Sequence, residues 1–152
     1  MPELHDANLS GVRMDWVYVR ELFFKDPEPS EGKPTLPEAT ATISLEHAIA
    51  ADAQSCTNRL TIELSIPGKT TNPFVRAVVE ARFSKASEKS VVDISQFASL
   101  QGPVIVMPFL RDAVATATGK SRFGQILLAP INVQSLTAQA AATAPQAAAT
   151  PK

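Results

Sequence analysis

The sequence predicts an α+β fold, in which a four-stranded antiparallel sheet carries a long helix packed on one face and a short C-terminal helix. Three observations support this prediction. Apolar and polar residues alternate with period two over residues 12–26, 39–49, 59–66 and 74–84. Helical spacing replaces this alternation over 103–118. The four strands follow one another along the chain, so we expect an antiparallel meander with one face exposed to water.

Composition predicts a folded domain that has no strongly charged partner. The chain has 152 residues, of which 45% are hydrophobic and 19% charged, and its formal net charge is −1. So small a net charge gives no overall attraction to nucleic acid or to anionic membranes. The N-terminus lacks an apolar targeting segment, and the longest apolar stretch, 102–110, is about half the length of a membrane span. We therefore expect a cytoplasmic protein that does not insert into membranes.

The first strand, over 12–26, carries apolar residues on both faces. Met14, Trp16, Tyr18 and Leu22 should point to one side, where Arg20 is an exception, while Val17, Val19 and Phe23 point to the other. A strand that packs on one side alternates more cleanly than this. The strand therefore lies either beneath a loop or against another subunit.

A crossover loop separates the first strand from the second. Residues 26–38 hold four prolines and Gly32, a density that neither a helix nor a ladder tolerates. Apart from its prolines, Leu36 is the apolar residue of this loop. On the second strand, His47 belongs to the inward face, where we expect it to be half-buried and structural.

The third strand ends at the turn pair Pro67–Gly68. The fourth strand should direct Arg76, Glu80 and Arg82 into water. Its expected inward residues are Val75, Ala77, Val79, Ala81 and Phe83.

Capping residues mark the helices. Asp93 can cap a short helix over 94–100, Pro103 suits the first turn of the long helix, and Gly119 suits its end. Asn132 can cap a last helix that runs from Val133 to about Ala144. We expect a loose arm over 1–11, a domain over 12–137 and an alanine-rich tail over 138–152 that frays and then becomes disordered.

The long helix predicts oligomerisation. Its apolar residues, among them Ile105, surround most of its circumference, and a helix that is apolar all round is buried on all sides. One small domain does not supply that much cover, so subunits should pack through the first strand and the long helix. The expected interface residues are Trp16, Tyr18, Val106, Phe109 and Val114.

Catalytic and metal-binding patterns are missing from the sequence. It has no Ser–His–Asp grouping, phosphate-binding loop or zinc motif, and its one cysteine, Cys56, should be an inert thiol. We therefore expect no enzyme, no metal and no cofactor. The alternative from another class is a hot-dog-like thioesterase that uses Asp112, the one carboxylate of the long helix.

The stretch 103–136, PVIVMPFLRDAVATATGKSRFGQILLAPINVQSL, resembles the C-terminal half of the protein-export chaperone SecB. The shared pattern is two prolines at this spacing, an aromatic residue, a helix that ends near glycine, and a Leu-Ala-Pro-Ile-Asn run. These positions are Pro103, Pro108, Phe109, Gly119, Phe123, Leu128, Ala129, Pro130, Ile131 and Asn132. In the first half, 16–27 and Pro37–Glu38 agree more loosely, so that the resemblance covers about 12–137.

The resemblance implies a SecB-like dimer of dimers that holds unfolded polypeptides, such as preproteins for export, in apolar grooves without ATP. The implied groove residues are Leu36, Ala41, Ile43, Leu45, Val133 and Leu136, although Ile43 and Leu45 fit an ordinary core equally well. The motor SecA is an implied partner that docks on acidic residues of the outer sheet face. Glu21 fits one such place, whereas Lys25 and Arg76 or Ala77 stand where acids are expected. A chaperone dedicated to a toxin–antitoxin system is the alternative within the family.

Overall fold

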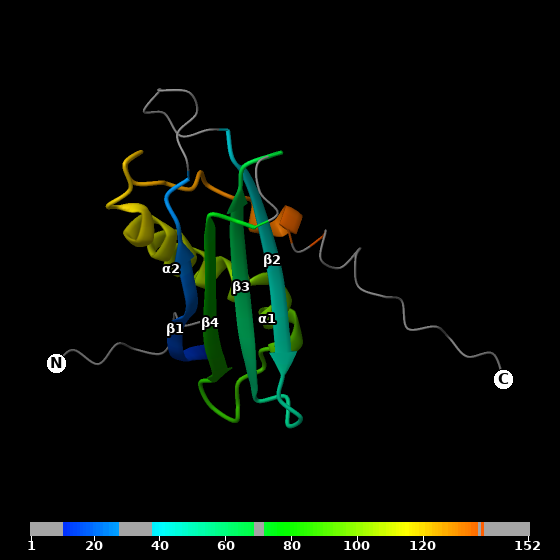
Figure 1. Cartoon of the computed structure of the whole chain (residues 1–152). Coiled ribbons are helices and arrows are strands. Elements are labelled where there is room, and N and C mark those ends of the chain that lie inside the picture. The colour runs from blue at the N-terminus through cyan, green and yellow to red at the C-terminus, as the bar shows by residue number, and fades with distance from the viewer. Residues whose placement is uncertain (1–10, 28–37, 69–71, 137, 139–152) are drawn as a thin grey trace, which may run out of the picture.

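The computed structural model describes residues 11–27, 38–68, 72–136 and 138, which form a four-stranded antiparallel sheet with two helices behind it (Figure 1). The strands are β1 (Val12–Phe24), β2 (Thr40–Ile49), β3 (Ser55–Ser65) and β4 (Val75–Lys85). The helices are α1 (Ile94–Leu100) and α2 (Gly102–Thr118). The predicted α+β fold is confirmed. The predicted arm and tail lie outside the described residues, except for Gly11 and Ala138.

The strand order is β1–β4–β3–β2, so the predicted meander is wrong for the first strand. β2, β3 and β4 pair in succession as expected, but β1 pairs with β4. Short links force neighbours in sequence to be neighbours in the sheet, and the link between β1 and β2 is not short. β1 and β2 therefore form the two opposite edges of the sheet.

Two bulges decide which side chains of β1 face the helices. The register with β4 shifts between Met14 and Trp16, and again between Val19 and Glu21. Each shift leaves one residue unpaired and reverses the alternation that follows. The side chains on the helix side are those of Met14, Val17, Val19, Leu22 and Phe24, and those on the outer side are Trp16, Tyr18, Glu21 and Phe23. The predicted common face for Met14, Trp16, Tyr18 and Leu22 is therefore wrong.

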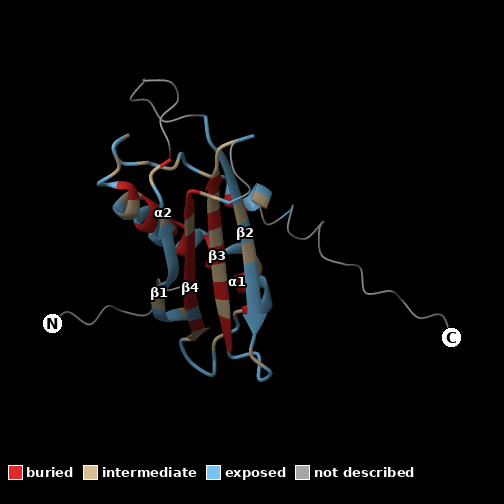
Figure 2. Ribbon diagram, viewed as in Figure 1, coloured by how far each residue is buried: buried red, intermediate tan, exposed pale blue. Residues whose placement is uncertain are grey.

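The core lies between the two central strands and one stripe of α2. Figure 2 shows β3 and β4 largely buried and the edge strands largely exposed. The inward residues predicted for β4 are all buried, with Val75, Ala77, Val79 and Ala81 fully so. On the opposite side of the core, Val106, Leu110 and Val114 of α2 are also fully buried.

A buried amide fixes the corner between α1 and α2. Asn58 of β3 donates from Nδ2 to the Ala98 carbonyl oxygen at 2.7 Å. A Cβ atom on Gly102 would lie 2.3 Å from Oδ1 of Asn58, so the corner needs glycine at this position. The predicted cap of α1 is confirmed, because Oδ1 of Asp93 accepts hydrogen bonds from the Ser95 and Gln96 amides.

The chain after α2 runs back along that helix in an extended form. Oγ1 of Thr118 accepts a hydrogen bond from the Ile126 amide at 2.9 Å, and Arg111 donates to the Leu128 carbonyl oxygen at 2.9 Å. Asn132 then caps a last helical turn by accepting from the amides of Gln134 and Ser135. This segment carries the last turn back toward the corner of α1 and α2.

Candidate functional site

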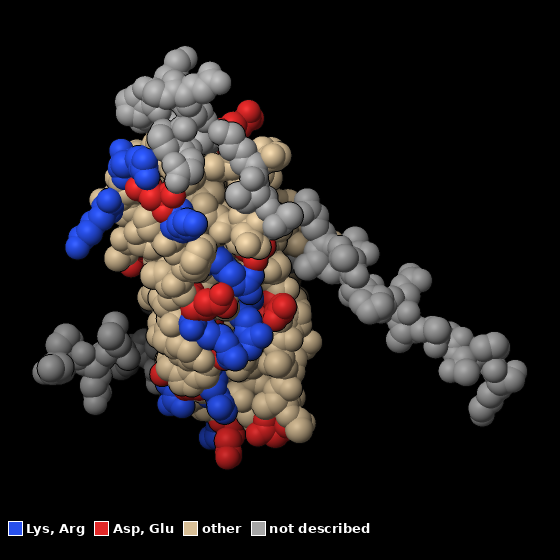
Figure 3. Space-filling view, in the orientation of Figure 1, with Lys and Arg blue, Asp and Glu red and all other residues tan. Residues whose placement is uncertain are grey.

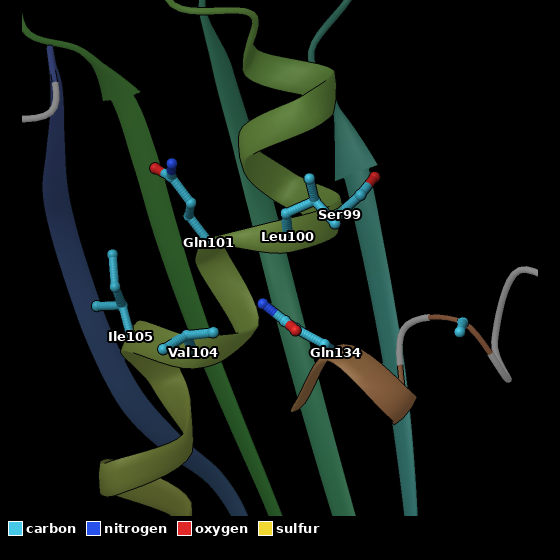
Figure 4. Close-up of a pocket in the computed structure, with 7 residues that line it drawn as sticks. Ser99, Leu100, Gln101, Val104, Ile105 and Gln134 are labelled. Carbon is cyan, nitrogen blue, oxygen red and sulfur yellow. The ribbon is translucent and has the colours of Figure 1, made fainter. Parts of the chain in front are cut away.

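A pocket of about 840 Å³ lies between the corner of the two helices and the last helical turn (Figure 4). Its lining is mostly apolar, and Leu100, Val104 and Ile105 are 48%, 50% and 39% exposed. Ser99, Gln101, Gln134 and Ala138 complete the lining. No charged side chain lines the pocket within the described residues, so an apolar, uncharged group fits it best.

A second hollow, of about 320 Å³, continues the first along α1. The two hollows share Leu100 and Gln101, and the second is also lined by Val91 and Val92 at its far end. Val91 is almost wholly exposed. Asp93 and Gln96 also line the second hollow, so the two hollows make one elongated surface that is apolar at the corner of the two helices and more polar along α1.

The groove residues predicted from the resemblance lie at the border of the core. Ile43 and Leu45 are half-buried and pack against the core, and Ala41 is exposed beside them. Val133 is buried in the core, and Leu136 packs against it from the last turn. Leu36 lies outside the described residues. Ile43, Leu45, Val133 and Leu136 thus belong to the same hydrophobic core or border it.

Sequence reasoning missed Leu100 and Val104 as exposed apolar residues. The signal was present, because α2 has a second apolar stripe beside the one that faces the sheet. Ile105 and Phe109 are four positions apart and therefore neighbours on the surface of the helix, and Val104 lies beside them. Treating the helix as apolar all round merged the two stripes into one.

The predicted interface residues divide into two groups. Trp16, Tyr18 and Phe109 are 37%, 46% and 39% exposed, so they are available to a partner. Val106 and Val114 have no exposed surface at all, because they point from α2 into the core of their own chain. The prediction that these two valines contact another subunit is wrong.

Both faces of β1 carry exposed apolar side chains. Met14, Val19 and Leu22 are exposed on the helix side, and Trp16, Tyr18 and Phe23 on the outer side. The rings of Trp16 and Tyr18 lie 5.2 Å apart. The described residues contain no loop that covers them, so the two-faced pattern of β1 is an unpartnered apolar surface of the single chain.

The outer sheet face carries a network of paired charges, which Figure 3 shows as a band of basic and acidic side chains. Glu80 is buried and accepts hydrogen bonds from Arg20 of β1 at 2.9 Å and Arg59 of β3 at 3.0 Å. Arg59 also pairs with Glu46 of β2. The network therefore links all four strands, and the prediction that Glu80 faces open water is wrong.

Ion pairing lowers the pKa of the Glu80 carboxyl. Burial raises the pKa of its carboxyl, but the hydrogen bonds and charges of Arg59 and Arg20 outweigh that effect, so the pKa lies below its ordinary value. Glu21, the predicted docking residue, pairs with Arg76 at 2.9 Å, and Arg76 also pairs with Glu63. This face is therefore a neutralised surface and not a free acidic one.

The remaining candidate side chains show no arrangement for catalysis. Cys56 is buried, and burial raises the pKa of its thiol, which agrees with the predicted inert thiol. Asp112 is exposed and lies outside both hollows. His47 is exposed and not half-buried as predicted, because it lies near the end of an edge strand.

The described residues contain neither a cluster of side chains for a metal ion nor a helix that could span a membrane. No three of their His, Cys, Asp and Glu side chains gather closely enough to hold an ion. Across the same residues, none of the helices has the length and apolar character needed to cross a bilayer.

Comparison with one solved structure, that of a SecB-like chaperone, supports the fold. The SecB-like chaperone Rv1957 of Mycobacterium tuberculosis, in complex with a ChAD peptide from the antitoxin HigA1, matches with a TM-score of 0.54 and 18% identity. The match covers 81% of this chain and 92% of that one. A Streptococcus agalactiae protein of unknown function matches with a TM-score of 0.40 and 12% identity, over 78% of this chain and 97% of that one.

Comparison with protein families identifies the chain. The family model for the preprotein translocase subunit SecB matches residues 5–144, which is nearly the whole sequence. This result confirms the predicted resemblance and supports a chaperone role. It also confirms that the chain is not an enzyme, so the thioesterase alternative is excluded. The chain belongs to the SecB family.

Proposed function

We propose that this protein is an ATP-independent chaperone that holds unfolded polypeptides, including preproteins for export, in the cytoplasm. The observation that carries the proposal is the elongated surface along α1, apolar at the corner of the two helices, with Leu100, Val104 and Ile105 exposed and no charged residue in the larger hollow. A wide and largely apolar surface can bind many different sequences. The sequence holds no phosphate-binding loop, so binding and release would follow affinity alone.

Assembly as a dimer of dimers is part of the proposal. Trp16, Tyr18 and the other exposed apolar residues of β1 support one interface, and Phe109 on α2 supports the second. Val106 and Val114 are not part of the proposed interface, because they are buried within their own chain. Light scattering should give the mass of a tetramer, and a monomer mass at micromolar concentration would refute this part.

A holding assay tests the main proposal. Reduced insulin aggregates when its B chain is released, and a stoichiometric amount of this protein should suppress that aggregation without nucleotide. Ile105→Asp should weaken the suppression, because a carboxylate in the apolar surface loses water without gaining a partner. Asp112→Asn, on the exposed side of the same helix, is the matched control. Unchanged aggregation with the wild-type protein would contradict the holding function.

A chaperone dedicated to an antitoxin is the second candidate. It is favoured by the outer sheet face, where Glu21 is already paired with Arg76, so that a motor such as SecA would meet few free carboxylates. The solved SecB-like chaperone Rv1957 binds a peptide from an antitoxin, which illustrates such a client. Titration of the tetramer with purified SecA distinguishes the two roles: saturable binding favours export, and its absence favours a dedicated client.

A further inference from the structure

A buried polar side chain lies beneath the corner between α1 and α2. Asn58 is on the side of β3 that faces the core, between Cys56 and Leu60, and it is 1% exposed. Its Nδ2 donates to the Ala98 carbonyl oxygen at 2.7 Å, and its Oδ1 accepts from the Cys56 thiol at 3.9 Å. Both ends of the amide are therefore engaged, which fixes the orientation of the side chain.

The corner itself has no linker that would set its angle. Gln101 ends α1 and begins α2, so the two helices share this one residue. Its side chain makes no capping hydrogen bond to α2. The Ala98 carbonyl belongs to the last turn of α1, where carbonyl groups have no partner within their own helix. The hydrogen bond from Asn58 thus fastens the end of α1 directly to the sheet.

The space between Asn58 and the start of α2 is completely filled. A Cβ atom on Gly102 would lie 2.3 Å from Oδ1, 2.8 Å from Cγ and 3.0 Å from Nδ2 of Asn58. Any side chain at position 102 would therefore displace either the amide or the corner. Glycine allows the backbone of α2 to approach β3 this closely.

The shape of the apolar pocket depends on the corner. Leu100 and Gln101 line both hollows, and both lie within three residues of Ala98. Figure 4 shows them where the two helices meet, with Val104 and Ile105 following on α2. A shift of the corner away from β3 would move Leu100 and Gln101 together, and it would change the width of the pocket.

An asparagine at this place in the core does more than fill space. A buried polar group whose partners are satisfied selects one arrangement of the packed elements. We propose that Asn58 is a positioning residue for the holding site: through Ala98 it keeps the corner at the distance from β3 that shapes the apolar pocket. This inference rests on the proposed holding function.

Amide hydrogen exchange of the full-length protein tests the positioning step without a client. The Gln101 amide donates to the Phe97 carbonyl oxygen at 2.9 Å, and the Ile105 amide donates to the Gln101 carbonyl oxygen at 3.1 Å, so both amides report on the corner. Asn58→Ala should make both exchange at least about tenfold faster. Val75→Ala leaves a void at the far end of β4 and should leave their exchange unchanged. Equal acceleration by the two variants, or none by Asn58→Ala, would overturn the proposal.

Client binding tests the consequence for the pocket. The probe is fluorescein-labelled insulin B chain, reduced and alkylated, and its binding is followed by anisotropy at a temperature where every variant is folded. Asn58→Ala should weaken binding about tenfold, whereas Val75→Ala should bind as the wild type does. If the wild-type protein does not bind the B chain, the holding function itself fails. If the wild type binds and Asn58→Ala binds equally well, this inference alone fails.

Gly102 gives an independent readout. Gly102→Ala should lower the melting temperature of the wild type, because the added Cβ meets the Asn58 side chain. In the Asn58→Ala background that side chain is absent, so Gly102→Ala should change the melting temperature little. The double variant should still bind the B chain about tenfold more weakly than the wild type, because the bond to Ala98 is missing. Wild-type binding by the double variant would show that Asn58 merely fills space, and would overturn the proposal.

Discussion

The two edges of the sheet differ in almost every property that decides how a strand meets a neighbour. β1 is bulged at two places and carries exposed apolar side chains on both faces. β2 is regular, polar on its outer side and only half-buried on its inner side. Bulges disturb the ladder that an added strand needs, whereas a regular edge preserves it. The difference indicates that β1 suits a side-chain interface and β2 suits backbone pairing.

The shared centre of the sheet makes this division possible. β3 and β4 supply most of the buried core together with the two helices, and the edge strands add only partly buried residues, such as Val17 of β1 and Ile43 of β2. The charge network on the outer face ties Arg20 of β1 and Glu46 of β2 to the central strands through Glu80 and Arg59. Each edge can therefore keep apolar or unpaired groups exposed while the chain remains folded.

The largest loss of stability is expected from a change in the core, because both edge strands pack against it. Val106 has no exposed surface and lies in the core, so Val106→Glu would bury an unpaired carboxylate and destabilise the chain by on the order of 4 kcal/mol. The adjacent Ile105 is 39% exposed, and Ile105→Glu should leave the free energy of unfolding nearly unchanged. Urea unfolding followed by circular dichroism measures both. Similar losses for the two variants would show that the two stripes of α2 are not distinct.

The second prediction separates the two edges by assembly. Leu22 of β1 and Ile49 of β2 are 46% and 37% exposed, so lysine is tolerated at either place in the single chain. Leu22→Lys should dissociate the oligomer, because it removes about 2 kcal/mol of apolar burial per copy and places a charge in the interface. Ile49→Lys should leave the mass unchanged. Light scattering at several concentrations measures both variants, and dissociation by Ile49→Lys alone would reverse the assignment of the edges.

The third prediction concerns the network that holds β1 to the centre. Glu80→Gln should lower the free energy of unfolding at neutral pH by about 1 kcal/mol, because the arginine partners lie in solvent and their attraction is screened. The pKa of Glu80 in the folded chain lies below its ordinary value. Its contribution is therefore complete above the unfolded-state pKa of about 4.3 and is lost as the pH falls through the folded-state pKa.

Unfolding of wild type and Glu80→Gln across that pH range checks the sign. The difference between the two proteins should shrink on acidification. A difference in the free energy of unfolding that grows at low pH would mean that the carboxylate destabilises the folded state. Arg13→Gln, which removes a pair at the exposed start of β1, serves as the control and should have no measurable effect.

Most of the fold could be predicted from the sequence, because its signals are local. The alternation of β3 and β4, the Asp93 cap and the Asn132 cap each depend on residues close together in the chain. The strand order could not be predicted, because the long link between β1 and β2 leaves the position of β1 to tertiary packing. The bulges of β1 could not be predicted either, since the shift after Met14 depends on its pairing with β4.

The candidate site was harder to predict than the fold. Trp16, Tyr18 and Phe109 are exposed in the single chain, because β1 and α2 each carry more apolar residues than one face can bury, and their role in an interface stays a prediction. Val106 and Val114 were misplaced, since helical period alone does not say which of two apolar stripes meets the sheet. Leu100 was missed because its exposure depends on the corner that Asn58 fixes from β3. Long-range contacts therefore decide where the exposed apolar surface lies.

The smallest effect is expected at the end of the chain, beside the edge of β2. Leu136 packs against the core from the last turn, so Leu136→Ala should weaken client binding about fivefold through lost apolar burial. Truncation after Thr137 removes Ala138, which lines the larger hollow, together with the alanine-rich segment beyond it. Alanine buries little area, whereas ordering each residue costs about 1–2 kcal/mol, so truncation should change the affinity less than about twofold. Anisotropy titrations with one labelled unfolded peptide compare the two variants. Equal losses would show that the alanine-rich segment closes over the client as a helix.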